Sequence, residues 1–184
     1  MSGIKKGDYV LKLAVLGDAG VGKTSLVNQF VEEKFKEDYK ATMGVNIIMK
    51  TIKLEQINSN ARLILWDIAG QEQYEKTRGA YYEGCAGALL VYDITRYSSF
   101  ENVEYKWLAD YKKHVEKKGS YILIGNKNDL EDQRYVYKDD ANKMAERIEA
   151  IEYIETSAKT GNNVDKAFLK LVYDILSNYG VKIE

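Results

Sequence analysis

The sequence predicts an α/β fold in which a mostly parallel sheet is covered by helices on both faces. Two observations support this prediction. Short apolar runs of strand length alternate with segments whose apolar residues recur at helical spacing. In addition, no repeat, low-complexity run or linker divides the 184 residues, a length that suits a single hydrophobic core.

Strand-like runs occur at six places along the chain. The first covers residues 9–16 and leads into a glycine-rich loop. Residues 45–54 and 62–67 lie on either side of a polar turn at Asn58-Ser59-Asn60. That arrangement is typical of an antiparallel hairpin, which makes the predicted sheet mixed. The remaining runs cover residues 88–93, 121–126 and 151–155.

Helical spacing of apolar residues occurs in four segments. They cover residues 24–33, 100–115, 141–148 and 164–175. Ser98 and Glu101 predict a capping box at the start of the second helix, and Asn162 is the expected N-cap of the last. Ligands of such folds bind at the carboxyl ends of the strands, so we expect functional motifs directly after the strand-like runs.

The composition excludes several classes of protein. The chain has 27 basic and 28 acidic side chains and a formal net charge of -1, so we expect no nucleic-acid partner. It has no proline, which excludes proline-rich linkers, and one cysteine, which excludes an internal disulfide. That cysteine, Cys85, is expected in the core. No run approaches the ~18 apolar residues of a membrane span, so we expect a cytoplasmic protein.

The first motif is a glycine-rich loop between a strand and a helix. Residues 17–24 read Gly-Asp-Ala-Gly-Val-Gly-Lys-Thr. Its glycines allow the backbone N–H groups to surround a phosphate chain, Lys23 can reach the terminal phosphates, and the Thr24 hydroxyl can bind Mg²⁺. The alternative is a glycine-rich turn with a surface lysine. The loop alone does not choose between ATP and GTP.

The second motif, Asp67-Ile68-Ala69-Gly70-Gln71, follows the strand of the hairpin. A carboxylate at Asp67 can hold Mg²⁺, Gly70 lets the backbone approach a γ-phosphate, and Gln71 can orient an attacking water. The alternative interpretation is a turn residue followed by a solvated glutamine.

The third and fourth motifs predict which base is bound. Asn126-Lys127-Asn128-Asp129 follows the fifth run, and Thr156-Ser157-Ala158-Lys159 follows the last. Guanine presents two adjacent donors that one carboxylate at Asp129 can accept, and adenine lacks this pair. Asn126 and Lys127 would shape the pocket, and a backbone N–H near Ala158 could donate to the guanine oxygen. Each motif alone is also an ordinary turn composition.

The four motifs in this order resemble the Ras superfamily of small GTPases over residues 9–179. The resemblance implies a P-loop NTPase small G domain: a six-stranded mixed sheet with one antiparallel edge hairpin, flanked by five helices. Residues 1–8 are then a short N-terminal extension and residues 180–184 a short tail.

The resemblance also implies GTP or GDP and Mg²⁺ as ligands. Thr42 corresponds to the switch threonine, Phe35 to the aromatic residue beside guanine, and Tyr39 to the tyrosine that closes over the phosphates. The resemblance assigns catalytic roles to Gln71, Lys23 and Thr42. It assigns binding of the metal ion to Thr24, Thr42 and Asp67. The nucleotide-binding set is Gly17, Ala19, Gly20, Val21, Gly22, Lys23, Thr24, Ser25, Phe35, Tyr39, Thr42, Gly70, Asn126, Lys127, Asp129, Ser157, Ala158 and Lys159.

Within the superfamily, residues 42–47, 81–84 and 91–95 look most like the Rab branch. The resemblance implies a monomer that meets an exchange factor, a GTPase-activating protein and effectors through residues 34–48 and 66–82. The Rab aromatic triad corresponds to Ile47, Trp66 and Tyr81, with Ile47 in place of the usual Phe. Strand alternation puts Trp66 opposite two leucines, which favours a Trp that faces a partner over one in the core.

Three departures from the family qualify this interpretation. Ala19 replaces a glycine of Ras-type members, and we expect its methyl group to crowd an incoming arginine finger. No Arg occurs in residues 34–43, so we expect slow intrinsic hydrolysis. The C-terminus lacks the prenylated cysteines of Rabs, so we expect no direct membrane anchor in these residues and membrane association only through a partner or a further tail. The rival functions are a non-hydrolysing GTP-binding scaffold and a P-loop nucleotide kinase.

Overall fold

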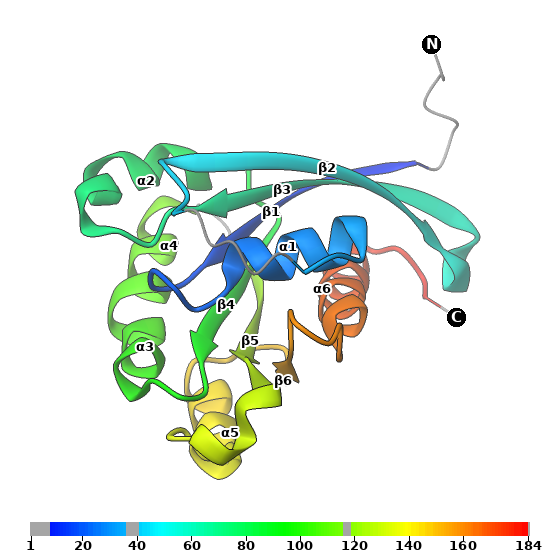
Figure 1. Ribbon diagram of the computed structural model, residues 1–184. Coiled ribbons are helices and arrows are strands. Elements are labelled where there is room, and N and C mark those ends of the chain that lie inside the picture. Colours follow the sequence, from blue (N-terminus) through cyan, green and yellow to red (C-terminus); the bar gives the residue numbers. More distant parts are fainter. Residues whose placement is uncertain (1–7, 36–40, 116–118, 184) are drawn as a thin grey trace.

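The computed structural model describes residues 8–35, 41–115 and 119–183. It contains one six-stranded sheet with the strand order β2-β3-β1-β4-β5-β6 (Figure 1). Only β2 and β3 pair antiparallel, at one edge of the sheet, and the other neighbours are parallel. The predicted mixed sheet is therefore confirmed. The strands are β1 Tyr9–Leu16, β2 Val45–Leu54, β3 Ser59–Ile68, β4 Gly87–Asp93, β5 Ser120–Asn126 and β6 Tyr153–Thr156.

Helices lie on both faces of the sheet (Figure 1). The α-helices are α1 Lys23–Glu32, α2 Glu75–Tyr82, α3 Tyr97–Asn102, α4 Ala109–His114, α5 Lys138–Arg147 and α6 Val164–Asn178. A π-helical segment, Val103–Leu108, joins α3 to α4, so these three pieces form one continuous helix. Counted in this way, the five helices of the predicted fold are present.

The edge hairpin differs from the sequence-based prediction. Its turn lies at Glu55–Ile57, which forms a short 3₁₀ helix and is followed by Asn58 at φ 44°. Ser59 and Asn60, predicted to be turn residues, instead pair with Leu54 and Lys53 at the start of β3. Turn composition was misleading here because the exposed end of an edge hairpin accepts polar residues within the strand.

Both predicted helix caps are wrong. The third helix begins after Arg96 without a side-chain cap, because the Ser99 hydroxyl donates to the Arg96 carbonyl at 2.7 Å. Ser98 and Glu101 therefore form no capping box at its start. The last helix begins after Asn163, which has a left-handed φ of 56° and no side-chain cap bond. At each start one backbone turn bond is present, from Ser99 N–H to the Arg96 carbonyl and from Val164 N–H to the Gly161 carbonyl.

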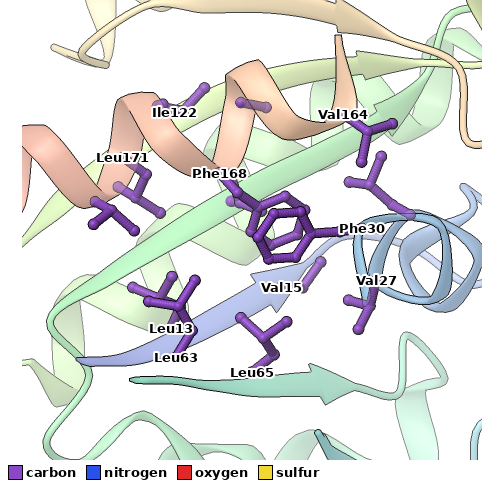
Figure 2. Close-up of a cluster of buried hydrophobic side chains, with 14 of the residues drawn as sticks. Leu13, Val15, Val27, Phe30, Leu63, Leu65, Ile122, Val164, Phe168 and Leu171 are labelled. Atoms are coloured by element: carbon purple, nitrogen blue, oxygen red, sulfur yellow. The ribbon is translucent and has the colours of Figure 1, made fainter. Parts of the chain in front are cut away.

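The core consists of two layers, one on each face of the sheet. On one face, Phe30 of α1 stacks on Phe168 of α6 with ring centroids 3.9 Å apart, above the side chains of Val15 and Leu65 (Figure 2). The other face is covered by α2, the α3–α4 helix and α5. The strands β4 and β5 are buried at every residue, which explains their unbroken apolar runs. The central strands of the sheet are thus packed on both faces.

Cys85 lies just before β4 and is buried, as predicted. Burial raises the pKa of its thiol to about 11, so the sulfur is protonated near neutral pH. Of the helices in the described ranges, none has both the length and the apolar character that crossing a bilayer requires.

Candidate nucleotide-binding site

The glycine-rich loop joins the end of β1 to α1. Gly17 has a φ of 150°, and a Cβ there would lie 2.1 Å from the carbonyl oxygen of Val91, so the close approach of β4 excludes any side chain. The loop ends at Gly22, and Lys23, Thr24 and Ser25 form the first turn of α1. The N–H groups of a first helical turn have no partner within the helix, so they can meet an anion in front of the loop.

Lys23 is buried, with only 6% of its surface exposed. Its ammonium group donates to the carbonyl oxygens of Gly17 at 2.7 Å and Asp18 at 2.8 Å. Burial lowers the pKa of Lys23 to about 8, and the charges of Asp67 and Asp18 only partly oppose this effect. The loop therefore contains a poorly solvated cation that an anionic ligand would stabilise.

We expect nucleotide affinity to weaken as the pH rises through the pKa of Lys23. Bound phosphate raises that pKa, so between the free and the bound value binding requires proton uptake. Affinity should be level below about pH 7 and about fourfold weaker at about pH 8.5. Titration of a fluorescent GDP analogue tests this expectation. Calorimetry in two buffers of different ionisation enthalpy should show the proton uptake, and a level affinity with no uptake would contradict it.

Three oxygen-bearing side chains meet beside the loop. The Thr24 hydroxyl donates to Asp67 Oδ2 at 2.6 Å and lies 2.8 Å from the Thr42 hydroxyl, which is itself 3.4 Å from the same carboxylate oxygen. Asp67 is fully buried, and its other oxygen has no hydrogen-bond partner in the described part of the chain. Burial raises the pKa of Asp67, although the hydrogen bonds from both threonines and the charge of Lys23 lower it.

This oxygen cluster fits a hard divalent cation such as Mg²⁺. It offers one carboxylate and two hydroxyls, and one buried oxygen of the carboxylate has no hydrogen-bond partner among the described residues. A cation there would also offset the free-energy cost of burying the negative charge of Asp67.

Gly70 and Gln71 close the other side of the loop. A Cβ on Gly70 would lie 2.3 Å from the backbone nitrogen of Ala19, so only glycine allows this contact between the two segments. Gln71 is half-buried, and its side-chain oxygen has no hydrogen-bond partner among the described residues. Nine residues line a small pocket here: Ala19, Gly20, Gly22, Lys23, Thr24, Thr42, Ala69, Gly70 and Gln71. The residues predicted for phosphate, metal and catalysis are thus brought together.

Asn126, at the end of β5, ties the loop to the last strand. Its side-chain nitrogen donates to the carbonyl oxygen of Val21 at 2.9 Å. Its side-chain oxygen accepts from the Thr156 hydroxyl at 3.0 Å and from the backbone N–H of Ala158 at 3.2 Å. The sequence predicted only that Asn126 shapes the pocket, whereas the structure places it at the centre of three chain segments.

The remaining base-site candidates lie on the same edge. Asp129 is exposed, and one of its carboxylate oxygens accepts from the Ser157 hydroxyl at 2.5 Å. Lys127 has a φ of 69° and pairs with Asp93 at 2.6 Å. Burial raises the pKa of Asp93, but hydrogen bonds from Lys127 and Thr95 outweigh it and hold that pKa below its usual range. Lys159 is exposed. The second, solvent-facing oxygen of Asp129 leaves this carboxylate able to accept from a ligand.

Two hydrogen bonds to the glycine-rich loop were not predicted from the sequence. Asp18 accepts from Asn102 at 2.8 Å and from the indole N–H of Trp107 at 2.7 Å. Trp107 lies in the π-helical segment and is fully buried, in agreement with the core position that its helical spacing predicts. A buried indole needs an acceptor, and that requirement was the only available signal.

Comparison with known proteins agrees with the geometry of the site. The model of the Ras family matches residues 12–177. The chain belongs to the Ras family. It is 42% identical over 177 residues to the Ras-related protein RABA4b of Arabidopsis thaliana, covering 96% of this chain and 77% of that protein. It is 42% identical over 173 residues to Rab-13 of Mesocricetus auratus, with 94% and 83% covered, and 41% identical over 175 residues to Rab-10 of Diplobatis ommata, with 95% and 86% covered. It is therefore a small GTPase of the Rab branch.

Of the two remaining predicted residues of this Rab-branch GTPase, the structure describes only Phe35. Phe35 is 38% exposed at the end of the segment that follows α1. Tyr39 falls outside the described residues.

Three residues of the predicted partner surface, Ile47, Trp66 and Tyr81, are neighbours in the structure. Ile47 pairs with Trp66 across β2 and β3, and the ring of Trp66 lies 5.9 Å from that of Tyr81. Ile47 is 49% exposed, whereas Trp66 is half-buried under the ammonium group of Lys12, which lies 3.7 Å from the ring centroid. Leu63 and Leu65 are fully buried on the opposite face, as strand alternation predicted. Met49, 68% exposed, extends the apolar surface along β2.

Proposed function

We propose that this GTPase is a switch that binds GTP or GDP with Mg²⁺ and hydrolyses GTP slowly. The observation that carries the proposal is the contact of Thr24, Thr42 and Asp67, which come from three separate segments. Thr42 belongs to the segment before β2 and Asp67 to the end of β3, so a ligand at this point communicates with both. The accessible carboxylate of Asp129 supports guanine as the base.

In the proposed reaction, water attacks the γ-phosphorus of GTP and the bond to the β-phosphate oxygen breaks, which yields GDP and phosphate. Gln71 orients the water. Lys23 and the backbone N–H groups of the loop stabilise the charge that develops on the phosphate oxygens. Thr24, Thr42 and Asp67 would hold Mg²⁺, which when bound neutralises charge on the β- and γ-phosphates.

Switching would follow from the same contacts. Thr42 and Gly70 lie on the two segments that touch the glycine-rich loop, one through a hydroxyl pair and the other through backbone contact. A γ-phosphate would hold both segments against the loop, and its loss would release them. The output is then the shape of the surface around Ile47, Trp66 and Tyr81.

Slow turnover is expected because residues 34–43 contain no Arg to act in cis. Intrinsic rates of this type are on the order of 10⁻³–10⁻⁴ s⁻¹, so an activating protein would supply the rest. The methyl group of Ala19 lines the pocket, where it would crowd a finger residue from that protein. A non-hydrolysing scaffold is the alternative, and the position of Gln71 at the pocket argues against it.

A role in membrane traffic is proposed from the Rab-branch membership. Effectors, an exchange factor and an activating protein would contact residues 41–48 and 66–82 of the described chain. The exposed side chains of Ile47 and Met49 beside the Trp66–Tyr81 pair support an apolar partner surface there.

The nucleotide that co-purifies with the protein tests the proposal most directly. We expect GDP or GTP at about one molecule per chain, because the buried Lys23 and the residues of the small pocket around it offer one phosphate site. Denaturation followed by chromatography identifies the nucleotide, and a phosphate-release assay then separates a GTPase from a scaffold. ATP in place of a guanine nucleotide would overturn the proposal.

A further inference from the structure

The side chain of Arg96 lies against the glycine-rich loop, although Arg96 belongs to the turn between β4 and α3. Its Nη2 donates to the carbonyl oxygen of Ala19 at 2.8 Å. Its Nη1 lies 3.8 Å from the point where a Cβ on Gly20 would stand. The guanidinium therefore spans the backbone of two consecutive loop residues.

The backbone of Arg96 is held in place, so the reach of its side chain is not accidental. Its N–H donates to the Asp93 carbonyl at 2.9 Å, and its carbonyl accepts from the N–H and the hydroxyl of Ser99 at 3.1 and 2.7 Å. These bonds form the turn from which the α3–α4 helix starts. The side chain of Arg96 therefore extends to the loop from a hydrogen-bonded turn.

The charge of this guanidinium has no acidic partner in the described part of the chain. The two nearest acids along the loop and the turn are already engaged: Asp18 accepts from Asn102 and Trp107, and Asp93 pairs with Lys127. The Nε of Arg96 is buried and has no hydrogen-bond partner among the described residues. A partly buried, unpaired guanidinium is costly unless an anion completes it.

The field of Arg96 reaches the phosphate-binding lysine. Burial is the largest cause of the low pKa of Lys23, and the positive charge of Arg96 lowers that pKa further. The two positive charges therefore repel each other. A bound polyphosphate would relieve this repulsion and be attracted by both charges.

We propose that Arg96 is a nucleotide-binding residue that holds the loop at Ala19 and places a permanent positive charge beside the phosphates shared by GDP and GTP. This inference rests on the proposed function. Among the described residues, Arg96 bonds to the loop at Ala19, lies beside Gly20 and makes no hydrogen bond to Gln71, so we expect it to act on the dissociation of both nucleotides and not on the hydrolysis step.

The test measures the rate at which a fluorescent GDP analogue leaves the full chain, with excess GDP as the chase. Arg96→Gln keeps a neutral donor for the Ala19 carbonyl and removes the charge, so we expect release to be about tenfold faster. Arg96→Lys keeps the charge and should stay within about threefold of the unsubstituted protein at low salt. Arg62→Ala, at an exposed site on β3, loses the same charge and is the matched control, with no expected effect.

Salt separates a charge effect from a structural one. The difference between Arg96→Gln and the unsubstituted protein should shrink between about 0.05 M and about 0.5 M salt, because ions screen the guanidinium. Equal release from both proteins would overturn the inference. So would equal losses in Arg96→Gln and Arg96→Lys without salt dependence, or a fall in single-turnover hydrolysis with release unchanged. Failure of the unsubstituted protein to bind the analogue at all would instead overturn the proposed function.

Discussion

Replacing Asp129 by Asn is expected to move the base preference of this GTPase from guanine to xanthine. The carboxylate is exposed and can accept from both guanine donors, and Ser157 donates to one of its two oxygens. Asparagine offers one acceptor and one donor, which suits the carbonyl that xanthine has in place of the 2-amino group. Two charge-assisted hydrogen bonds are at stake, so GTP affinity should fall by about 10²- to 10⁴-fold.

Competition between GTP and xanthosine triphosphate for a fluorescent GDP analogue measures this preference. Asp132→Asn is the matched control, because Asp132 is an exposed acid in the same turn, and it should leave the preference for GTP unchanged. If Asp129→Asn still prefers GTP, base recognition lies elsewhere. Asn is nearly the size of Asp and keeps an acceptor for the Ser157 hydroxyl, so the substituted protein should fold.

Replacing Gln71 by Leu is expected to abolish most of the intrinsic GTP hydrolysis while nucleotide binding persists. The Gln71 side chain lines the pocket beside Ala19 and Thr42, and its buried oxygen has no hydrogen-bond partner among the described residues. Such an oxygen is suited to accept from an attacking water. Leucine keeps the volume and loses the acceptor, so single-turnover hydrolysis should slow by roughly tenfold or more.

A matched control for this experiment is Gln73→Leu, an exposed glutamine in the next turn of chain. Its rate should equal that of the unsubstituted protein. Equal rates for Gln71→Leu and Gln73→Leu would remove Gln71 from the mechanism. Measuring release of the fluorescent GDP analogue from the same proteins ensures that a lower rate reflects chemistry and not loss of binding.

Residues whose type has few alternative uses were predictable from the sequence. Gly17 and Gly70 lie where a side chain would collide with backbone, so their positions in the motifs correspond to steric requirements. The apolar runs of β4 and β5 correspond to strands covered on both faces. These residue types show their use in the sequence because few other types could replace them, although the atoms that they meet belong to distant segments.

Residues whose type has several uses were not predictable from the sequence, because the fold decides which use applies. Ser98 and Asn162 have the composition of helix caps, but the backbone at those helix starts is satisfied by other contacts. Ser59 and Asn60 have turn composition and lie in a strand because the edge hairpin continues past them. Trp107 has core periodicity and is also the donor that holds Asp18.

The sequence by itself determined the fold class, the order of the motifs and the edge of the sheet at which they meet. Periodicity and strand–loop–helix order do not depend on distant residues. Only the tertiary structure decided which side chains touch across segments: Thr24 with Thr42 and Asp67, Asn126 with Val21 and Ala158, and Arg96 with Ala19. The physical reason is that these contacts join residues 18 to 105 positions apart, and their geometry is set by the packing of both core layers and not by any local preference.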